Sequence, residues 1–232
     1  KIVFLGESSS GSSIQCQCDT LGNCTTLRGG ISIGGSEGAG RRPQNITVRN
    51  CTITGNVKLQ SPDTCPEARR YCRYQGLGTS NAISCLSNAN CPQGLLCTRD
   101  RTSCADTQPG FPEWVRARAP RRITFDHVTI AGDTGVDRFY VGWGATETKL
   151  INSVITGKAA GVPVYLAPHS SGTVIKNNRF DIATTDHDRE VIAIDGSDHN
   201  RIISNWFSGT LNHGGIYLFR NCGERGTIRH TT

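Results

Sequence analysis

The sequence predicts an all-β solenoid, a parallel β-helix whose coils hold about 25 residues each. Three observations lead to this fold class. Strand-like segments recur at a fixed period, because Leu150, Ile175 and Ile202 occupy the same place in successive segments. Gly accounts for 27 of the 232 residues, which indicates many tight turns. No helical periodicity is long enough to supply the crossovers of a doubly wound sheet.

The first strand-like segment of each period carries alternating apolar residues, then a small polar pair, then Ile or Phe. It occurs at 46–53, 123–130, 148–155, 173–180 and 200–207, with a partial copy at 227–232. Phe125 precedes Leu150 by 25 residues, and Ile228 follows Ile202 by 26. The 77-residue step from Val48 to Phe125 equals about three periods and contains a Cys-rich block. Such alternation is typical of strands with one buried face.

A second strand-like triplet lies inside each period, about nine residues before the next first segment. The triplets are 139–141, 164–166, 192–194 and 216–218. We therefore expect two or three short strands per coil, with successive coils stacked at the ~4.8 Å spacing of a sheet.

The polar pair in each first segment is a further repeated feature. It reads Asn50-Cys51, His127-Val128, Asn152-Ser153, Asn177-Asn178 and Ser204-Asn205. Asn tolerates the left-handed conformation and can hydrogen-bond the Asn of the next coil. We therefore expect a structural Asn ladder, in which His127 fills one slot.

Eleven Cys residues indicate an oxidising compartment, and ten of them precede residue 105. The block from 65 to 104 holds little apolar material, so disulfides are the expected source of its order. A zinc site is the alternative, but no CxxC pair or interleaved His supports it. The protein is expected to be secreted or at a cell surface, with a leader removed or never supplied. The odd count leaves one thiol free or paired between chains, and Cys222 is the obvious candidate.

The predicted organisation is a single β-helix domain. It has N-terminal coils at 1–60, a Cys-rich insertion at 61–119 and further coils at 120–232. Sequons begin at Asn23, Asn45 and Asn50, and glycosylation there would make the chain a glycoprotein. The longest apolar runs are too short to cross a bilayer, so membrane insertion is not expected.

Over about residues 45–60 and 120–232, the repeat resembles the right-handed parallel β-helix superfamily of pectate-lyase-like proteins. That superfamily includes polysaccharide lyases, polygalacturonases, alginate epimerases, phage tailspikes and adhesins. The resemblance implies a right-handed helix and leaves the activity open, because one fold hosts many functions.

Two short stretches look like the alginate C5-epimerases, in which an I-D-P-H-D turn precedes a coil reading H-G-I-I-I-S-R. They are Ile-Asp-Gly-Ser-Asp at 194–198 and the segment 213–220, which begins His-Gly-Gly and ends Phe-Arg. By this resemblance Asp195 and Asp198 match the two motif aspartates, and Arg220 matches the substrate-binding Arg.

The rest of the motif fits less closely. His213 matches its second His, with one inserted residue in the segment that follows. The catalytic His of the motif falls on Ser197, so His199 or His169 would have to act as the base. Without such a base, proton abstraction at C5 of a uronate has no acceptor.

Residues just after the second strands would share one face of the stack, because equal positions in successive coils form columns. This face would combine an aromatic ring, His, carboxylates and a guanidinium, the groups needed to bind and deprotonate an acidic sugar. The candidate catalytic residues are His169, Asp195, Asp198, His199 and Arg220, and the candidate substrate-binding residues are Trp143 and His213. A solvated polar turn is the alternative interpretation.

No metal ligand set is assigned, and no cofactor is certain. Asp186-His187-Asp188 could hold Ca²⁺, which polysaccharide lyases commonly use, but the triplet alone supplies too few oxygens. The net charge of +6 favours an anionic partner. The basic run at 116–122 is expected to be a solvated connector, and no nucleic-acid partner is predicted.

Two functions remain open from the sequence. The first is a secreted polysaccharide-active enzyme, a lyase or epimerase acting on an acidic uronate glycan. The second is a non-catalytic surface adhesin or a fibre subunit that associates end to end, because a β-helix has unpaired strand edges at its ends.

Overall fold

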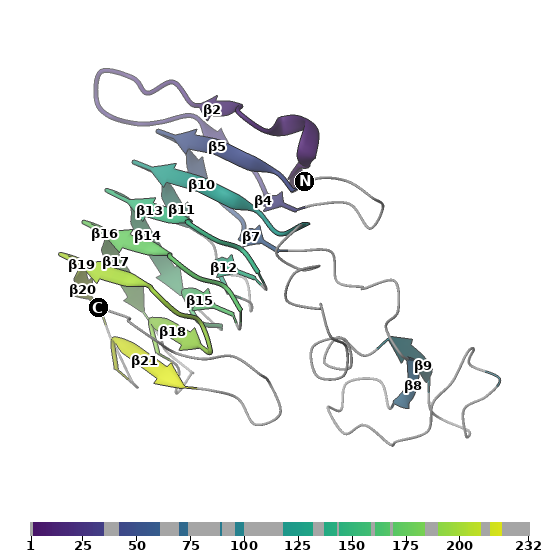
Figure 1. Cartoon of the computed structure of the whole chain (residues 1–232). Helices are drawn as coiled ribbons and strands as arrows, with labels where there is room; N and C mark the ends of the chain where they lie inside the picture. The colour runs from purple at the N-terminus through teal and green to yellow at the C-terminus, as the bar shows by residue number, and fades with distance from the viewer. Residues whose placement is uncertain are drawn as a thin grey trace.

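The computed structural model describes residues 2–34, 42–60, 70–73, 89, 96–99, 118–131, 137–142, 144–158, 161–167, 169–183, 190–209 and 214–219. Figure 1 shows most of the described strands stacked one above another along a common axis. None of the helical residues described forms a helix long and apolar enough to span a membrane.

Three parallel sheets form the walls of the solenoid, here named sheets A, B and C. Sheet A contains, in stacking order, β1 (Ile2–Leu5), β4 (Gly30–Ile33), β7 (Val57–Leu59), β12 (Phe139–Val141), β15 (Val164–Leu166), β18 (Ile192–Asp195) and β21 (Ile216–Phe219). Sheet B contains β2 (Ser13–Gln15), β5 (Gln44–Arg49), β10 (Arg121–Asp126), β13 (Lys149–Ile151), β16 (Val174–Lys176) and β19 (Arg201–Ile203). Sheet C contains β3 (Thr26–Leu27), β6 (Thr52–Ile53), β11 (Thr129–Ala131), β14 (Val154–Lys158), β17 (Arg179–Ala183) and β20 (Trp206–Ser208).

Each coil passes through sheets B, C and A in turn, as β13, β14 and β15 do. A 3₁₀ turn, η1 (Glu7–Ser9), links β1 to the first coil. Each first segment of the repeat is therefore two strands joined at a corner, and each triplet is the third strand. The predicted all-β parallel β-helix is confirmed.

The strand register confirms the period. Phe125 pairs with Leu150, Leu150 with Ile175, and Ile175 with Ile202. These side chains, from adjoining strands of sheet B, point into the solenoid, where Phe125, Leu150 and Ile175 have no exposed surface. Each fully buried Leu, Ile or Phe contributes about 1.5–3 kcal/mol to stability.

The same register corrects the interpretation of the 77-residue step. Val48 pairs directly with Phe125, and β6 and β7 pair with β11 and β12. The step is therefore one coil that carries a long insertion and does not hold three periods. Within this insertion β8 (Arg70–Arg73) and β9 (Leu96–Arg99) form an antiparallel pair, whose backbone register places Cys72 opposite Cys97.

The corner between sheets B and C holds the predicted ladder. All five first positions of the polar pair have φ between 51° and 56°, namely Asn50, His127, Asn152, Asn177 and Ser204. Asn177 Nδ2 donates to Asn152 Oδ1 at 3.3 Å, and His127 Nδ1 lies 2.7 Å from Asp126 Oδ1. The left-handed conformation explains why Asn dominates this position. The ladder prediction is confirmed for Asn152 and Asn177; His127 takes the same left-handed slot, but Asn152 Nδ2 donates to Asp126 Oδ1 on that coil, at 2.9 Å.

The second positions of the pair form a buried ladder. Asn178 Oδ1 accepts from the Ser153 backbone N–H at 2.9 Å, and its Nδ2 donates to the Leu150 carbonyl at 2.8 Å. One coil further, Asn205 Oδ1 accepts from the Asn178 backbone N–H at 2.9 Å. These side chains therefore satisfy backbone groups that the corner removes from the sheets.

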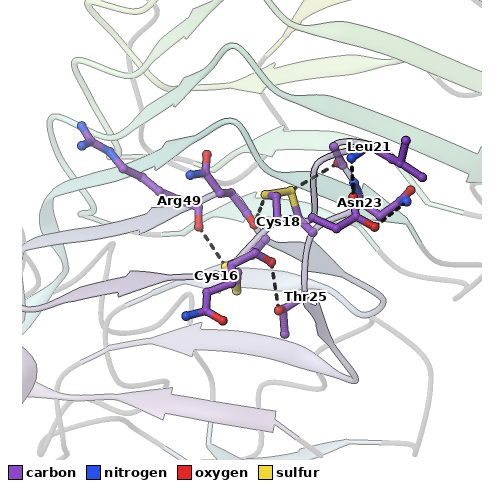
Figure 2. The surroundings of a disulfide bond; sticks show 12 residues. Cys16, Cys18, Leu21, Asn23, Thr25 and Arg49 are labelled. Carbon is purple, nitrogen blue, oxygen red and sulfur yellow. Dashed lines mark hydrogen bonds between the residues drawn. A yellow bond between two sulfur atoms is a disulfide. The ribbon is translucent and has the colours of Figure 1, made fainter.

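Two disulfides lie in the first coils. Cys16 bonds to Cys51 across neighbouring coils, and Cys18 bonds to Cys24 within one turn. Figure 2 shows the two bridges with the small turn between Cys18 and Cys24, where Asp19 Oδ1 accepts the backbone N–H groups of residues 21 and 23. Disulfides are consistent with an extracellular protein. The expected bridges of the block from 65 to 104, and Cys222, lie outside what the structure describes.

Candidate functional site

The outer face of sheet A carries a column of tyrosines. Strand alternation turns Val164 and Leu166 inward and Tyr165 outward. The register aligns Tyr140, Tyr165, Ala193 and Tyr217 on successive coils. The Tyr140 and Tyr165 rings stack with centroids 5.7 Å apart and planes 15° from parallel. Tyr217 is exposed, whereas Ala193 between Tyr165 and Tyr217 has no exposed surface, so the aromatic column is interrupted on that coil.

Asp195 lies beside this column at the end of β18. It follows Ala193 by two residues, so its side chain lies on the same face as Tyr165. The Tyr165 hydroxyl donates to Asp195 Oδ2 at 2.5 Å. Asp195 has no exposed surface. The buried carboxylate of Asp195 therefore orients the phenol of Tyr165. Of the two residues, only Tyr165 is partly accessible to solvent.

The turn from residue 196 to residue 200 carries the chain from sheet A to sheet B. Asp198 and His199 lie on its outer side, with His199 Nδ1 3.4 Å from Asp198 Oδ2. The His199 side chain is 59% exposed, and that of Asp198 is 27% exposed. His199 has φ of 54°, which lets the turn project its imidazole outward. The pair has the composition of a base with an adjacent carboxylate.

Ser197 and Asn200 point the other way. Ser197 Oγ donates to the Ser170 carbonyl at 2.9 Å and accepts from Asn200 Nδ2 at 2.9 Å. Asn200 Oδ1 in turn accepts the Thr173 backbone N–H at 3.1 Å. Ser197 thus occupies a buried structural slot, at the place where the epimerase motif has its catalytic His.

His169 lies in the equivalent turn one coil earlier. Its backbone N–H donates to the Gly196 carbonyl at 3.4 Å, and Ser171 pairs with Asp198 in a short parallel bridge. His169 is half-buried and has φ of 62°. The fold therefore brings His169, Asp198 and His199 to one corner of the solenoid, with Asp195 where that corner begins.

The same corner, on the coils nearer the N-terminus, is occupied by an ion-pair cluster. Glu147 accepts from Arg122 Nε at 3.0 Å and from Arg121 Nε at 2.7 Å. These hydrogen bonds, with that from Arg122 the larger influence, hold the pKa of Glu147 below its ordinary value. The backbone pairing places Glu147 beside Gly172, and Gly172 beside His199. Because its carboxylate is engaged by two guanidinium groups, Glu147 is not available to pair with His199.

Three predicted site residues, Trp143, His213 and Arg220, lie outside the described residues, as do Asp186 to Asp188. Within the described ranges, no three His, Cys, Asp or Glu side chains gather as a metal site. Sequence reasoning did not select Tyr165. Its signal was present in the second-strand triplets, whose middle residues are Tyr140, Tyr165, Ala193 and Tyr217.

Comparisons with known proteins add little to this geometry. No family model matches the chain, and no curated protein matches its sequence. Among solved structures, a "putative glycosyl hydrolase" from Parabacteroides merdae is similar at 10% sequence identity with a TM-score of 0.38. The similarity spans 95% of this chain and 85% of that one. At such a TM-score it carries no argument about activity, so function has to be inferred from the side chains themselves.

Proposed function

We propose that the chain is an extracellular protein that acts on an acidic polysaccharide, as a lyase or an epimerase of uronate units. The observation that carries this proposal is the Tyr165–Asp195 hydrogen bond beside the exposed Asp198–His199 pair. Asp195 and His199 are four residues apart, so their Cα atoms lie within about 14 Å of each other. Both pairs can therefore meet one bound oligosaccharide.

The outer face of sheet A suits a sugar chain. The stacked rings of Tyr140 and Tyr165 and the exposed ring of Tyr217 carry polar tips, and such side chains combine apolar area with hydrogen-bonding capacity. Lys58 is exposed and pairs in register with Tyr140, so an ammonium group lies at the N-terminal end of the tyrosine column. Its charge complements a sugar carboxylate.

The two proposed activities share their first step. A base removes the proton from C5 of the uronate, next to the carboxylate. In a lyase the electron pair then forms the C4–C5 double bond, while the C4–O bond breaks and the leaving oxygen takes a proton. In an epimerase the proton returns to C5 from the opposite face. His199, supported by Asp198, is the proposed base, with His169 as the alternative, and the Tyr165 hydroxyl is the proposed proton donor.

The test is turnover of polygalacturonate and of alginate, followed by absorbance of unsaturated ends for a lyase and by NMR for an epimerase. We expect His199→Gln and Tyr165→Phe each to lower kcat at least about 100-fold, the usual contribution of a general acid or base. His127→Gln is the matched control, because it removes an exposed imidazole beside a carboxylate at the corner between sheets B and C. Full activity of both test variants would overturn the site.

A second function, an adhesin or fibre subunit, is favoured by a different observation. Strands β19, β20 and β21 each end their sheet among the described residues. Ile216 and Leu218 continue the inward-facing columns of sheet A, yet they are 43% and 48% exposed. An apolar coil end of this kind suits stacking of a further coil. Filaments in electron microscopy without glycan turnover would favour this function over the first.

A further inference from the structure

The outer face of sheet B carries three cations on successive coils. Lys149 is in β13, Lys176 in β16 and Arg201 in β19, and all three side chains are exposed. Each alternates with a residue that points inward, respectively Leu150, Ile175 and Ile202. The three charged groups, here called the cation triangle, therefore project from one side of one sheet.

The register fixes the spacing of the triangle. Lys149 pairs with Val174, and Val174 pairs with Arg201, so the two cations share a column with one coil between them. Two strand spacings place their Cα atoms about 10 Å apart. Lys176 lies on the middle coil, two residues further along its strand, which puts it about 8 Å from each of the others. All three therefore lie within about one Debye length of one another at physiological salt.

No acid of the described residues neutralises the cation triangle. Two nearby carboxylates of the described residues are already engaged, since Asp126 pairs with Arg49 and Glu147 pairs with two Arg side chains. The positions between the triangle's members are the half-buried Ile151, Val174 and Ile203. Within the part of the chain that the structure describes, strands β13, β16 and β19 thus present positive charge without an internal counter-ion.

We propose that the cation triangle is a docking surface for an acidic polysaccharide whose chain runs along the solenoid axis, across the coils. This inference rests on the substrate class of the proposed function but uses a different face of the molecule. The sheet stacks cations at a constant interval along the axis, which matches a polymer with regularly spaced carboxylates. Such a surface would hold the polymer while the side chains at the corner between sheets A and B act on its uronate units.

The same surface suits nucleic acid and membranes less well. No aromatic side chain lies on sheet B among its described outward positions, so it offers no stacking platform for unpaired bases. Its outward apolar residues are half-buried β-branched side chains, which cannot insert into a bilayer. The two disulfides indicate an oxidising compartment, which agrees with the extracellular polysaccharide of the proposed function.

The test compares a triple variant, Lys149→Gln with Lys176→Gln and Arg201→Gln, against wild type. Binding of polygalacturonate and alginate oligosaccharides is measured by calorimetry at about 0.15 M salt, with neutral dextran as the uncharged probe. We expect the Kd of the triple variant to rise at least about tenfold, since one cation near an anionic surface contributes about a factor of five. Salt at about 1 M should abolish wild-type binding, because the Debye length falls to about 3 Å.

A matched control removes the same charge elsewhere. Arg28 is exposed at the other end of the solenoid, Glu147 keeps its pair with Arg121, and Asp181 lies on sheet C. Changing Arg28, Arg122 and Arg179 to Gln therefore lowers the net charge equally while the cation triangle stays intact. We expect this control to bind within about threefold of wild type. Equal weakening of both triple variants, equal binding of dextran, or no polyuronate binding by wild type would each overturn the proposal.

Turnover by the wild-type protein separates this inference from the proposed function. Binding that depends on the cation triangle, in a wild-type protein without turnover of either polyuronate, supports the docking surface and contradicts the enzyme. If wild type turns over a polyuronate and the triple variant of Lys149, Lys176 and Arg201 binds it with unchanged Kd, the enzyme is supported and the docking surface is overturned.

Discussion

The buried amide ladder allows a quantitative test of what holds the coils together. Asn178 is 2% exposed, and its side chain makes three hydrogen bonds, to the Ser153 N–H, the Leu150 carbonyl and Asn205 Oδ1. In an Asn178→Ala variant, the Ser153 and Leu150 backbone groups lose a partner inside the solenoid. Each buried group left unsatisfied costs about 1–3 kcal/mol, so we expect a loss of about 2–5 kcal/mol. For a chain of this size, 3 kcal/mol lowers Tm by on the order of 10 °C.

The neighbouring residue supplies the control. Asn177 is exposed, has φ of 56° and makes one long hydrogen bond to Asn152. Glycine adopts this conformation without strain, so Asn177→Gly should cost no more than about 0.5 kcal/mol. Both variants would be compared by calorimetry and by urea midpoint with disulfides intact. A Tm loss for Asn178→Ala no larger than that for Asn177→Gly would refute the claim that buried amide bonds stabilise the corner.

Two further predictions concern charge and disulfides. Hydrogen bonds from two Arg side chains depress the pKa of Glu147 in the folded state, so its stabilising effect is present near pH 7 and is lost as pH falls through that lowered pKa. Because the Glu147 side chain is 44% exposed, Glu147→Gln should lower the free energy of unfolding by at most about 1 kcal/mol at pH 7. Near pH 2 the variant and wild type should be equally stable. A stability difference that does not change with pH would contradict this prediction. The Cys16–Cys51 bridge closes a separation of 35 residues and Cys18–Cys24 one of 6, so loop-closure entropy assigns about 4 and about 2 kcal/mol to them. Thermal unfolding of the two double Cys→Ala variants should show the larger loss for the longer loop, and the reverse order would exclude the entropic account.

The period was readable from the sequence because stacking imposes it. Leu150, Ile175 and Ile202 must be apolar to fill the interior, and each must return after one circuit of the three sheets. The left-handed corner was readable for a similar reason, since few residues other than Asn and Gly adopt positive φ cheaply. These two requirements apply to every coil, so they produce a repeated pattern in the sequence.

The position of the insertion and the residues of the candidate site were harder to predict from the sequence. The step from Val48 to Phe125 falls near a multiple of the period, and only the strand register shows that it is one coil. Asp195 was expected in the turn just after its strand, but it is the last residue of β18, and its complete burial depends on what packs over it, which alternation does not determine. Tyr165 was overlooked because an outward Tyr in a short strand is equally expected of an ordinary solvated sheet.

The corner between sheets B and C and the corner between sheets A and B carry different kinds of side chain, and this difference bears on function. At the corner between sheets B and C, the left-handed position holds mostly amides that bond to one another along the stack, as Asn177 and Asn152 do. At the corner between sheets A and B, the left-handed position holds Arg122, Glu147 and His199 on different coils. The backbone demand is the same at both corners, so it cannot explain the chemical variety of the second. Side chains that stacking does not prescribe are free to serve a ligand, and this is why the corner with His199 is the place to look for catalysis.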